Sequence, residues 1–190
     1  MCPREHASSP LVVRADQVEA GRLVRGLVGC PVCRAEWNIE SGVLHLGAPI
    51  AGTPPSRVDP VTLAALLGLS EPDALVVVDG LSLETVGELA AGFGARVIVL
   101  DDEASPSAAG VIVGAERVPL GAGAVVAAFL ARPRRSDAFI DSVINAVRAG
   151  GRVAGVGSFA GRGDLVELAR DGTLWVAERA RPRVGITRRR

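Results

Sequence analysis

The sequence predicts an α/β protein in which a small β-rich head precedes a larger, mostly parallel sheet. All three cysteines lie in the first 33 residues, which suggests that a metal holds the head together. From residue 58 onward, runs of Val, Ile, Leu and Ala alternate with helical patterns, as in buried parallel strands joined by helices. With 48% hydrophobic but only 3% aromatic residues, aliphatic side chains must fill the core.

The head is predicted to contain two short strands and one hairpin, at residues 11–14, 22–29 and 36–46, with the hairpin turning at Ser41-Gly42. Residues 47–56 then include three prolines and two glycines, which cannot continue either regular structure. The expected organisation is a head over residues 1–47, a linker over 48–57 and a body over 58–190.

In the body, apolar runs and capped helical patterns alternate. Helices are predicted over 60–68, with Asp59 as N-cap and Pro60 first, over 82–92 and 136–148, each capped by its first serine, and over 162–170. Strands are predicted over 75–79, 96–102, 110–113, 124–128, 152–156, 174–178 and 183–187. This alternation predicts a parallel sheet with helices on both faces, and the last two strands should be antiparallel.

Four candidate metal ligands lie in two short segments of the head. Cys30 and Cys33 flank a Pro-Val turn, and Cys2 and His6 lie upstream. Three thiolates and one imidazole match the ligand set of a closed tetrahedral zinc site. Such a site has no open position, so we expect Zn²⁺ in a structural role, contributing folding free energy to a head with a very small core.

Three alternatives to this zinc site stay open. Cys30 and Cys33 could form a redox pair, although such a pair normally opens a helix and a strand pattern follows here. The head could also keep its fold without metal. Finally, His45 could replace His6 as the fourth ligand.

The second half of the head resembles a known family. Cys30-Pro-Val-Cys33, followed by an aromatic-x-Ile and a Gly-Val pair within residues 37–43, is similar to the zinc-ribbon family that includes the activator subunit of tRNA and protein methyltransferases. The first half departs from that family, with His6 in place of a thiol one position earlier. The resemblance implies a protein partner, or self-association through the ribbon, by strand addition to this chain's own body or that of a second copy.

The order of helices, strands and strand-end acids over 58–190 resembles a compact class I S-adenosylmethionine-dependent methyltransferase, with its Rossmann-like, mostly parallel sheet and antiparallel final strand. The resemblance implies S-adenosylmethionine as cofactor. It also implies four cofactor-binding residues: Asp79 and Gly80 after the first strand of the sheet, and Asp101 and Asp102 after the second.

The chain departs from this methyltransferase pattern in two loops. Only Asp79 and Gly80 remain of the glycine-rich first loop, and Leu81 and Leu83 are expected to crowd the cofactor. The loop over 114–119 lacks the Asp that reads the adenine in the family. Weak or absent cofactor binding is therefore expected. As an alternative role, the strand-end acids could cap helices or face solvent.

The charge balance limits other functions. The formal net charge is zero and every basic residue is Arg, so a phosphate-binding Gly-Lys-Ser loop is excluded. Arginine clusters at 132–135 and 188–190 could contact phosphates of a nucleic acid, but in a neutral chain we interpret them as solvated surface. No apolar run reaches membrane-span length, and the first residues do not resemble a signal peptide, so a cytoplasmic protein without membrane contact is expected.

These observations favour a zinc-ribbon, methyltransferase-like protein with an eroded cofactor pocket, acting as a non-catalytic partner or regulatory protein. The alternatives are an active S-adenosylmethionine-dependent methyltransferase with a divergent pocket, and a nucleic-acid-binding module.

Overall fold

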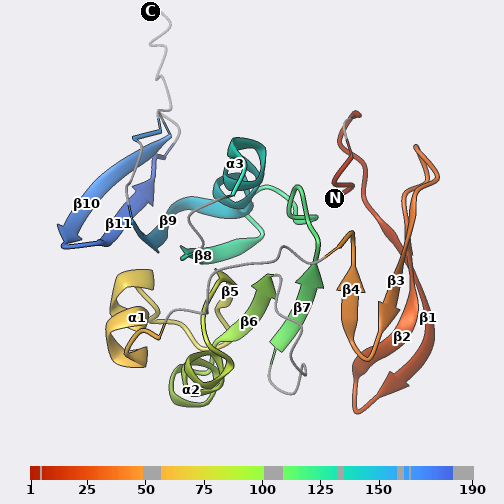
Figure 1. Ribbon diagram of the computed structural model, residues 1–190, viewed down its shortest axis with the longest axis horizontal. Helices are drawn as coiled ribbons and strands as arrows, with labels where there is room; N and C mark the ends of the chain where they lie inside the picture. Colours follow the sequence, from red (N-terminus) through yellow and green to blue (C-terminus); the bar gives the residue numbers. More distant parts are fainter. Residues whose placement is uncertain are drawn as a thin grey trace, which may run out of the picture.

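A computed structural model describes residues 1–4, 6–48, 57–100, 109–131, 135–157, 161–162 and 164–181. Within these ranges the chain is an α/β protein whose strands join in one mixed sheet (Figure 1). None of the described helices combines the length and the hydropathy that crossing a membrane requires.

The head forms an antiparallel meander of four strands, β1 (Val12–Glu19), β2 (Arg22–Gly29), β3 (Glu36–Glu40) and β4 (Val43–His45). Ser41 and Gly42 join β3 to β4 with φ angles of 51° and 78°, the left-handed conformations that a tight two-residue hairpin turn needs. The predicted hairpin is confirmed, whereas β1 runs well beyond the predicted residues 11–14.

The body contains three described helices, α1 (Pro60–Leu67), α2 (Leu83–Phe93) and α3 (Asp137–Ala146). Its strands are β5 (Leu75–Asp79), β6 (Arg96–Leu100), β7 (Ala109–Val113), β8 (Val125–Leu130), β9 (Val147–Val156), β10 (Leu165–Asp171) and β11 (Leu174–Arg179). The side chains of Asp59, Ser82 and Ser136 accept hydrogen bonds from backbone N–H groups in the first helical turns, so all three predicted N-caps are confirmed.

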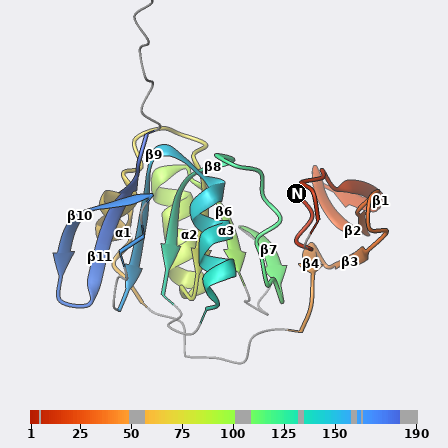
Figure 2. The same ribbon diagram turned by 90° about the horizontal axis from the view of Figure 1, so that it is seen from above.

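The strand order is β1-β2-β3-β4-β7-β6-β5-β8-β9-β11-β10. The segment β7-β6-β5-β8-β9 is parallel, and its chain order reverses between β5 and β8, which is the topological switch point of a doubly wound sheet. Helices α1 and α2 cover one face and α3 the other (Figure 2). The predicted parallel arrangement is thus found in the centre, while both ends of the sheet are antiparallel.

The central strand β5 divides the core into two layers. Val76 and Val78 pack on the side of α1 and α2, and Val77 packs with Phe139 of α3 on the other side. All three valines are fully buried, which explains why this strand is a continuous aliphatic run rather than an alternating one.

The prediction of a helix over 162–170 is wrong. Residues 165–171 form β10 instead, paired antiparallel with β11 across a turn in which Gly172 has a φ of 57°. The local apolar spacing fits a helix, but long-range pairing with β11 selects the extended form. The strand predicted over 183–187 lies outside the described residues, as does most of the linker.

The third helix of the body is also shorter than predicted. It ends at Ala146, and residues 148–151 belong to β9, where a register shift against β8 accommodates them. A Cβ on Gly151 would lie 2.4 Å from the carbonyl oxygen of Val126, so the Gly-Gly pair permits close strand packing rather than closing a helix.

The head joins the body through parallel pairing of β4 with β7, in which Val43 lies opposite Val111. Beyond the paired residues, the Leu46 N–H donates to the Val113 carbonyl at 2.8 Å. Gly47 then crosses Gly114 so closely that a Cβ on Gly114 would lie 2.2 Å from the Gly47 carbonyl carbon. Strand addition to the chain's own body, one of the two arrangements considered for the ribbon, is therefore present.

Gly114→Ala should destabilise this junction, because the new methyl group meets backbone and because Gly114 has a φ of +68°. The expected loss is about 1–3 kcal/mol of unfolding free energy in urea denaturation. Gly87→Ala, on α2 with open space around its Cβ position, is the matched control and should be neutral or slightly stabilising. Equal stability of the Gly114 variant and the parent would contradict the described crossing.

Candidate functional site

Cys30 and Cys33 lie on a tight turn that follows β2. The Cys30 N–H donates to the Ala35 carbonyl and the Arg34 N–H donates to the Cys30 carbonyl, both at 2.9 Å. Arg34 has a φ of 58°, which lets the chain reverse before β3. The turn therefore presents both thiols toward the same side, and a strand rather than a helix follows it.

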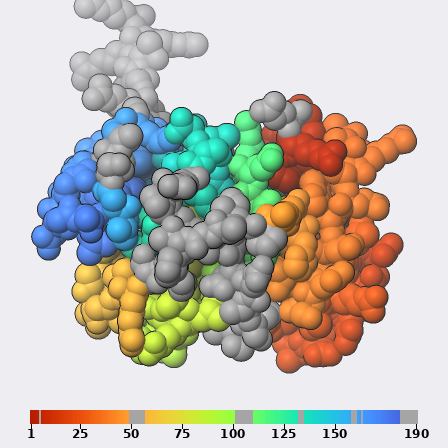
Figure 3. Space-filling view, in the orientation of Figure 1, coloured from red at the N-terminus to blue at the C-terminus, as the bar shows by residue number. Residues whose placement is uncertain are grey.

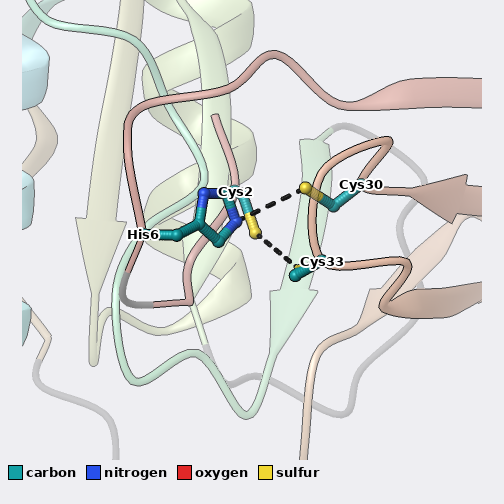
Figure 4. A group of neighbouring side chains, drawn as sticks. All are labelled: Cys2, His6, Cys30 and Cys33. Atoms are coloured by element: carbon teal, nitrogen blue, oxygen red, sulfur yellow. Dashed lines mark hydrogen bonds between the residues drawn. The ribbon is translucent and has the colours of Figure 1, made fainter.

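The other two predicted ligands come from the N-terminal loop. The Cys2 N–H donates to the Ser9 carbonyl at 2.9 Å, and the His6 N–H donates to the Arg4 carbonyl at 3.1 Å. These bonds curl the loop over the Cys30–Cys33 turn, and the four side chains converge (Figure 4). The ligand atoms of Cys2, His6, Cys30 and Cys33 all lie within 4.8 Å of one another.

The spacing of these atoms fits zinc. Cys2 Sγ lies 3.8 Å from Cys33 Sγ, and Cys30 Sγ lies 3.4 Å from His6 Nε2. A tetrahedron with zinc–sulfur and zinc–nitrogen bonds of about 2.3 and 2.0 Å has sulfur–sulfur edges of about 3.8 Å and sulfur–nitrogen edges of about 3.5 Å. Two of the distances therefore match edges of such a tetrahedron, and the remaining ones are at most 4.8 Å, so the four residues could hold a zinc ion.

The histidine also has the partner that a metal-ligating imidazole needs. His6 Nδ1 lies 2.6 Å from the Ala7 carbonyl oxygen, so Nδ1–H can donate there and leave Nε2 unprotonated toward the sulfurs. His45 lies outside the cluster, exposed on β4. The arrangement therefore brings His6, and not the alternative His45, to the thiols.

The thiols differ in acidity. Burial raises the pKa of Cys2 to about 11. Burial acts in the same direction on Cys30, but hydrogen bonds from the backbone N–H groups of Cys33 and Val32 and from the neighbouring thiols outweigh it and lower its pKa to about 6. These shifts favour the thiolate, the form that binds metal, at Cys30 rather than at Cys2.

At the switch point, the predicted cofactor acid Asp79 pairs with an arginine. Arg135, which follows β8, donates from Nε to Asp79 Oδ2 at 3.1 Å and from Nη2 to Oδ1. The two side chains are only 2% and 0% exposed. The guanidinium carbon also lies 4.2 Å from the centre of the Phe139 ring. Asp79 therefore neither caps a helix nor faces solvent.

The loop after Asp79 differs from its predicted role as well. Gly80 is buried with a φ of 75°. The Leu81 side chain is fully buried in the core beneath α1 and α2, so the prediction that it crowds a cofactor is wrong. Leu83 begins α2. Asp101 and Asp102, the other two predicted cofactor residues, lie outside the described residues.

A cavity of ≈ 1160 Å³ lies where the head meets the body. One wall is formed by Pro3 and Arg4 of the N-terminal loop that carries Cys2 and His6, here called the metal loop. The other walls are formed by Trp37 of β3, by residues 46–48, by residues 114–117 after β7 and by the start of α3. No pattern in the sequence predicts this cavity, because its walls come from segments far apart in the chain.

The prediction that the 132–135 cluster is solvated surface is wrong for Arg135, whose side chain is only 2% exposed. The sequence signal that points to such an ion pair is Asp79 at the end of a buried strand, because a buried carboxylate without a cation beside it is costly.

No protein-family model matches the chain, and no curated protein matches it either. Solved structures similar to its fold include geranyl diphosphate C-methyltransferase from Streptomyces coelicolor A3(2), at 18% identity and a TM-score of 0.42 over 51% of this chain and 42% of that one. A second is 1,6-didemethyltoxoflavin-N1-methyltransferase from Burkholderia thailandensis, at 12% identity and a TM-score of 0.48 over 64% of this chain and 76% of that one.

A third is the MycE methyltransferase of the mycinamycin pathway, at 10% identity and a TM-score of 0.48 over 66% of this chain and 50% of that one. The chain thus spans less than half the length of the first of these proteins. Because all three TM-scores are below 0.5, the doubly wound fold is assigned from the strand order and the switch point.

Protein purified without chelator should carry about one zinc per chain, measured by elemental analysis. His6→Ala should lower the zinc content and His45→Ala should not, because only His6 lies in the cluster. Zinc lost from the His45 variant and kept by the His6 variant would reverse the ligand assignment.

Cys30→Ser tests the division into head and body. If residues 1–47 and 58–190 fold as separate units, loss of the metal should unfold the head and leave the body folded. Hydrogen exchange resolves the two parts. A single transition shared by both would contradict the division.

Arg135→Met should cost about 3–5 kcal/mol of unfolding free energy, because it leaves the Asp79 carboxylate buried without its cation. Adding Asp79→Leu should recover most of that loss. Urea denaturation of both single variants and the double variant measures the coupling. Additive effects of the two substitutions would show that the pair is not coupled as described.

Proposed function

We propose that the chain is a non-catalytic, methyltransferase-like protein that acts as a partner or regulatory protein. The observation that carries the proposal is the buried ion pair between Asp79 and Arg135 at the switch point. In doubly wound sheets ligands bind at this crevice, outside the carboxyl ends of the strands. Here the acid at that position already has a protein cation as its partner.

Burial of the neighbouring loop supports the same function. A cofactor approaches a doubly wound sheet over the backbone of the first loop, where glycines allow close contact. Gly80 and Leu81 are both buried, and Ser82 is engaged as the N-cap of α2. Opening this loop to a cofactor would break the ion pair or expose part of the core, and both cost free energy.

The metal has a structural role in this proposal. Four protein ligands leave no open coordination position for water or substrate. The loop that carries Cys2 and His6 also anchors the chain to the body, where the amino group of Met1 donates to the Pro119 carbonyl at 2.6 Å. Thiolate ligands suit a reducing compartment such as the cytoplasm.

A protein partner has an available docking strand in β1, the outer edge of the head. All eight of its residues are exposed, and Val12, Val13 and Val18 are each more than half exposed. Edge strands with exposed apolar side chains pair readily with an extended segment of another protein. Because β4 is already occupied by β7, we assign partner binding to β1.

One observation favours a second candidate function, an active methyltransferase with a divergent pocket. The cavity of ≈ 1160 Å³ beside the carboxyl end of β7 has ample volume for a cofactor. In that case the cofactor would bind on the head side of the sheet, in a cavity that Arg135, the partner of Asp79, helps to line.

Calorimetric titration of the metal-loaded protein with S-adenosylmethionine separates the two candidates. The non-catalytic function predicts no saturable heat below millimolar cofactor, because each unpaired polar group of the ligand costs roughly 1–3 kcal/mol. The double variant Arg135→Met, Asp79→Leu, which lacks the ion pair at the switch point, serves as a control. Low-micromolar binding by the parent protein would overturn the proposal in favour of the methyltransferase.

A further inference from the structure

The strand β1 is an open edge at one end of the sheet. It pairs with β2 on one side, and within the described part of the chain no strand lies on its other side. In the space-filling view the red-orange atoms of the first strands form one margin of the molecule, and the blue atoms of β10 and β11 form the opposite one (Figure 3). Another chain can therefore reach β1 without displacing any described element.

The exposed side chains of β1 combine apolar groups with one ion pair. Val12, Val13 and Val18 are 62%, 54% and 56% exposed. Between them Arg14 Nε donates to Asp16 Oδ1 at 3.0 Å, and both of these side chains are also exposed. Exposed apolar side chains on one strand favour burial against another surface. The two opposite charges, two residues apart, give the strand a charge pattern that a partner strand must match.

A second copy of this chain matches that pattern when the two β1 strands run antiparallel. A two-fold axis relates such strands, so the same segment of each copy forms the contact. Directly opposite residues share a face of the sheet, and side chains alternate between faces. The axis therefore passes beside one residue rather than between two, and the choice of that residue fixes which charges meet.

One central residue gives both a long overlap and opposite charges. A centre at Arg14 places two arginines opposite each other, and a centre at Asp16 places two aspartates there. A centre nearer either end of β1 shortens the overlap. A centre at Ala15 places Arg14 of each copy opposite Asp16 of the other, and it overlaps residues 12–18 of both strands. This overlap includes all three exposed valines.

A bulge in β1 lies next to the same centre. The register against β2 shifts between Ala15 and Gln17, and Asp16 has no partner residue in β2. A bulge bends its strand, and it often closes an edge to other chains because a straight strand does not follow the bend. A second copy has the same bend, and a two-fold axis beside Ala15 brings the two bends together. The bulge therefore favours a second copy over a straight segment of another protein.

We propose that two copies of this chain associate through antiparallel pairing of their β1 strands, centred on Ala15, and so join two sheets into one. The proposal rests on the proposed function, because it names the partner that binds β1. The valines supply the apolar contact. Arg14 and Asp16 set the register rather than the affinity, because exposed ion pairs add little free energy. The two bodies then lie at opposite ends of the joined sheet.

A charge exchange between two variants tests the pairing. Sedimentation equilibrium of the full-length, zinc-loaded protein should show monomers and dimers without larger species, because the contact uses up the edge. Arg14→Asp makes both opposite positions acidic and Asp16→Arg makes both basic, so each variant alone should dimerise at least about tenfold more weakly. An equimolar mixture of the two variants should form dimers again, because an acidic strand then meets a basic one.

The matched control lies on β10, the other edge of the sheet. Arg170 Nε donates to Glu167 Oε1 at 3.1 Å, so Arg170→Asp breaks an ion pair of the same kind at a distance from β1. This variant should dimerise like the parent protein, and circular dichroism confirms that all variants are folded. A parent protein that is monomeric at every concentration would overturn the proposal. So would a mixture of the two β1 variants that stays monomeric, or a loss of dimers in the Arg170 variant.

Hydrogen exchange gives a second readout, because backbone N–H groups at the edge gain partners in the dimer. Residues 12–18 should exchange more slowly as the protein concentration rises, and residues 165–171 of β10 should not. Dimers without protection of residues 12–18 would place the contact elsewhere and overturn the proposal. The titration with S-adenosylmethionine is independent of these results. A monomer that binds no cofactor would overturn this proposal alone, and a dimer that binds the cofactor would overturn only the non-catalytic function.

Discussion

The pairing of β4 with β7 is the interaction on which the rest of the structure depends. It joins a four-stranded head to the parallel strands of the body and makes one sheet from two parts. The crossing of Gly47 and Gly114 brings the two backbones within a distance that no side chain would allow. The same pairing brings the metal loop against the body, where Met1 contacts Pro119, and it creates the cavity between them.

A metal ion bound by the Cys/His cluster would explain how so small a head can take part in this junction. Its buried apolar residues are few, among them Val28, Ile39 and Val43, and such a core gives little stability by itself. Coordination by residues from both segments would fix the N-terminal loop to the Cys30–Cys33 turn between β2 and β3. Such an ion would thereby stabilise β3, which carries Trp37, and β4, which pairs with β7.

The ion pair between Asp79 and Arg135 lies at the switch point, where doubly wound sheets usually bind their ligands. A buried arginine–carboxylate pair adds little net stability compared with apolar residues, but it is costly to break. Arg135 and Asp79 therefore hold the ends of β5 and β8 in one arrangement. At the junction, the cavity is lined by Arg4 and Trp37 from the head and by Arg117 from the body.

The sequence by itself determined what depends on local patterns: the two-part order of elements, the aliphatic strands, the three N-caps, the Ser41-Gly42 turn and the four ligands that converge. These follow from residues near one another in the chain, or from chemistry specific enough to need no neighbours. Only the tertiary structure decided that residues 165–171 form a strand, because pairing with β11 outweighs local helical spacing. It also decided that Arg135 is buried against Asp79 and that Arg4, Trp37 and Arg117 share one cavity, because each contact joins segments far apart in the chain.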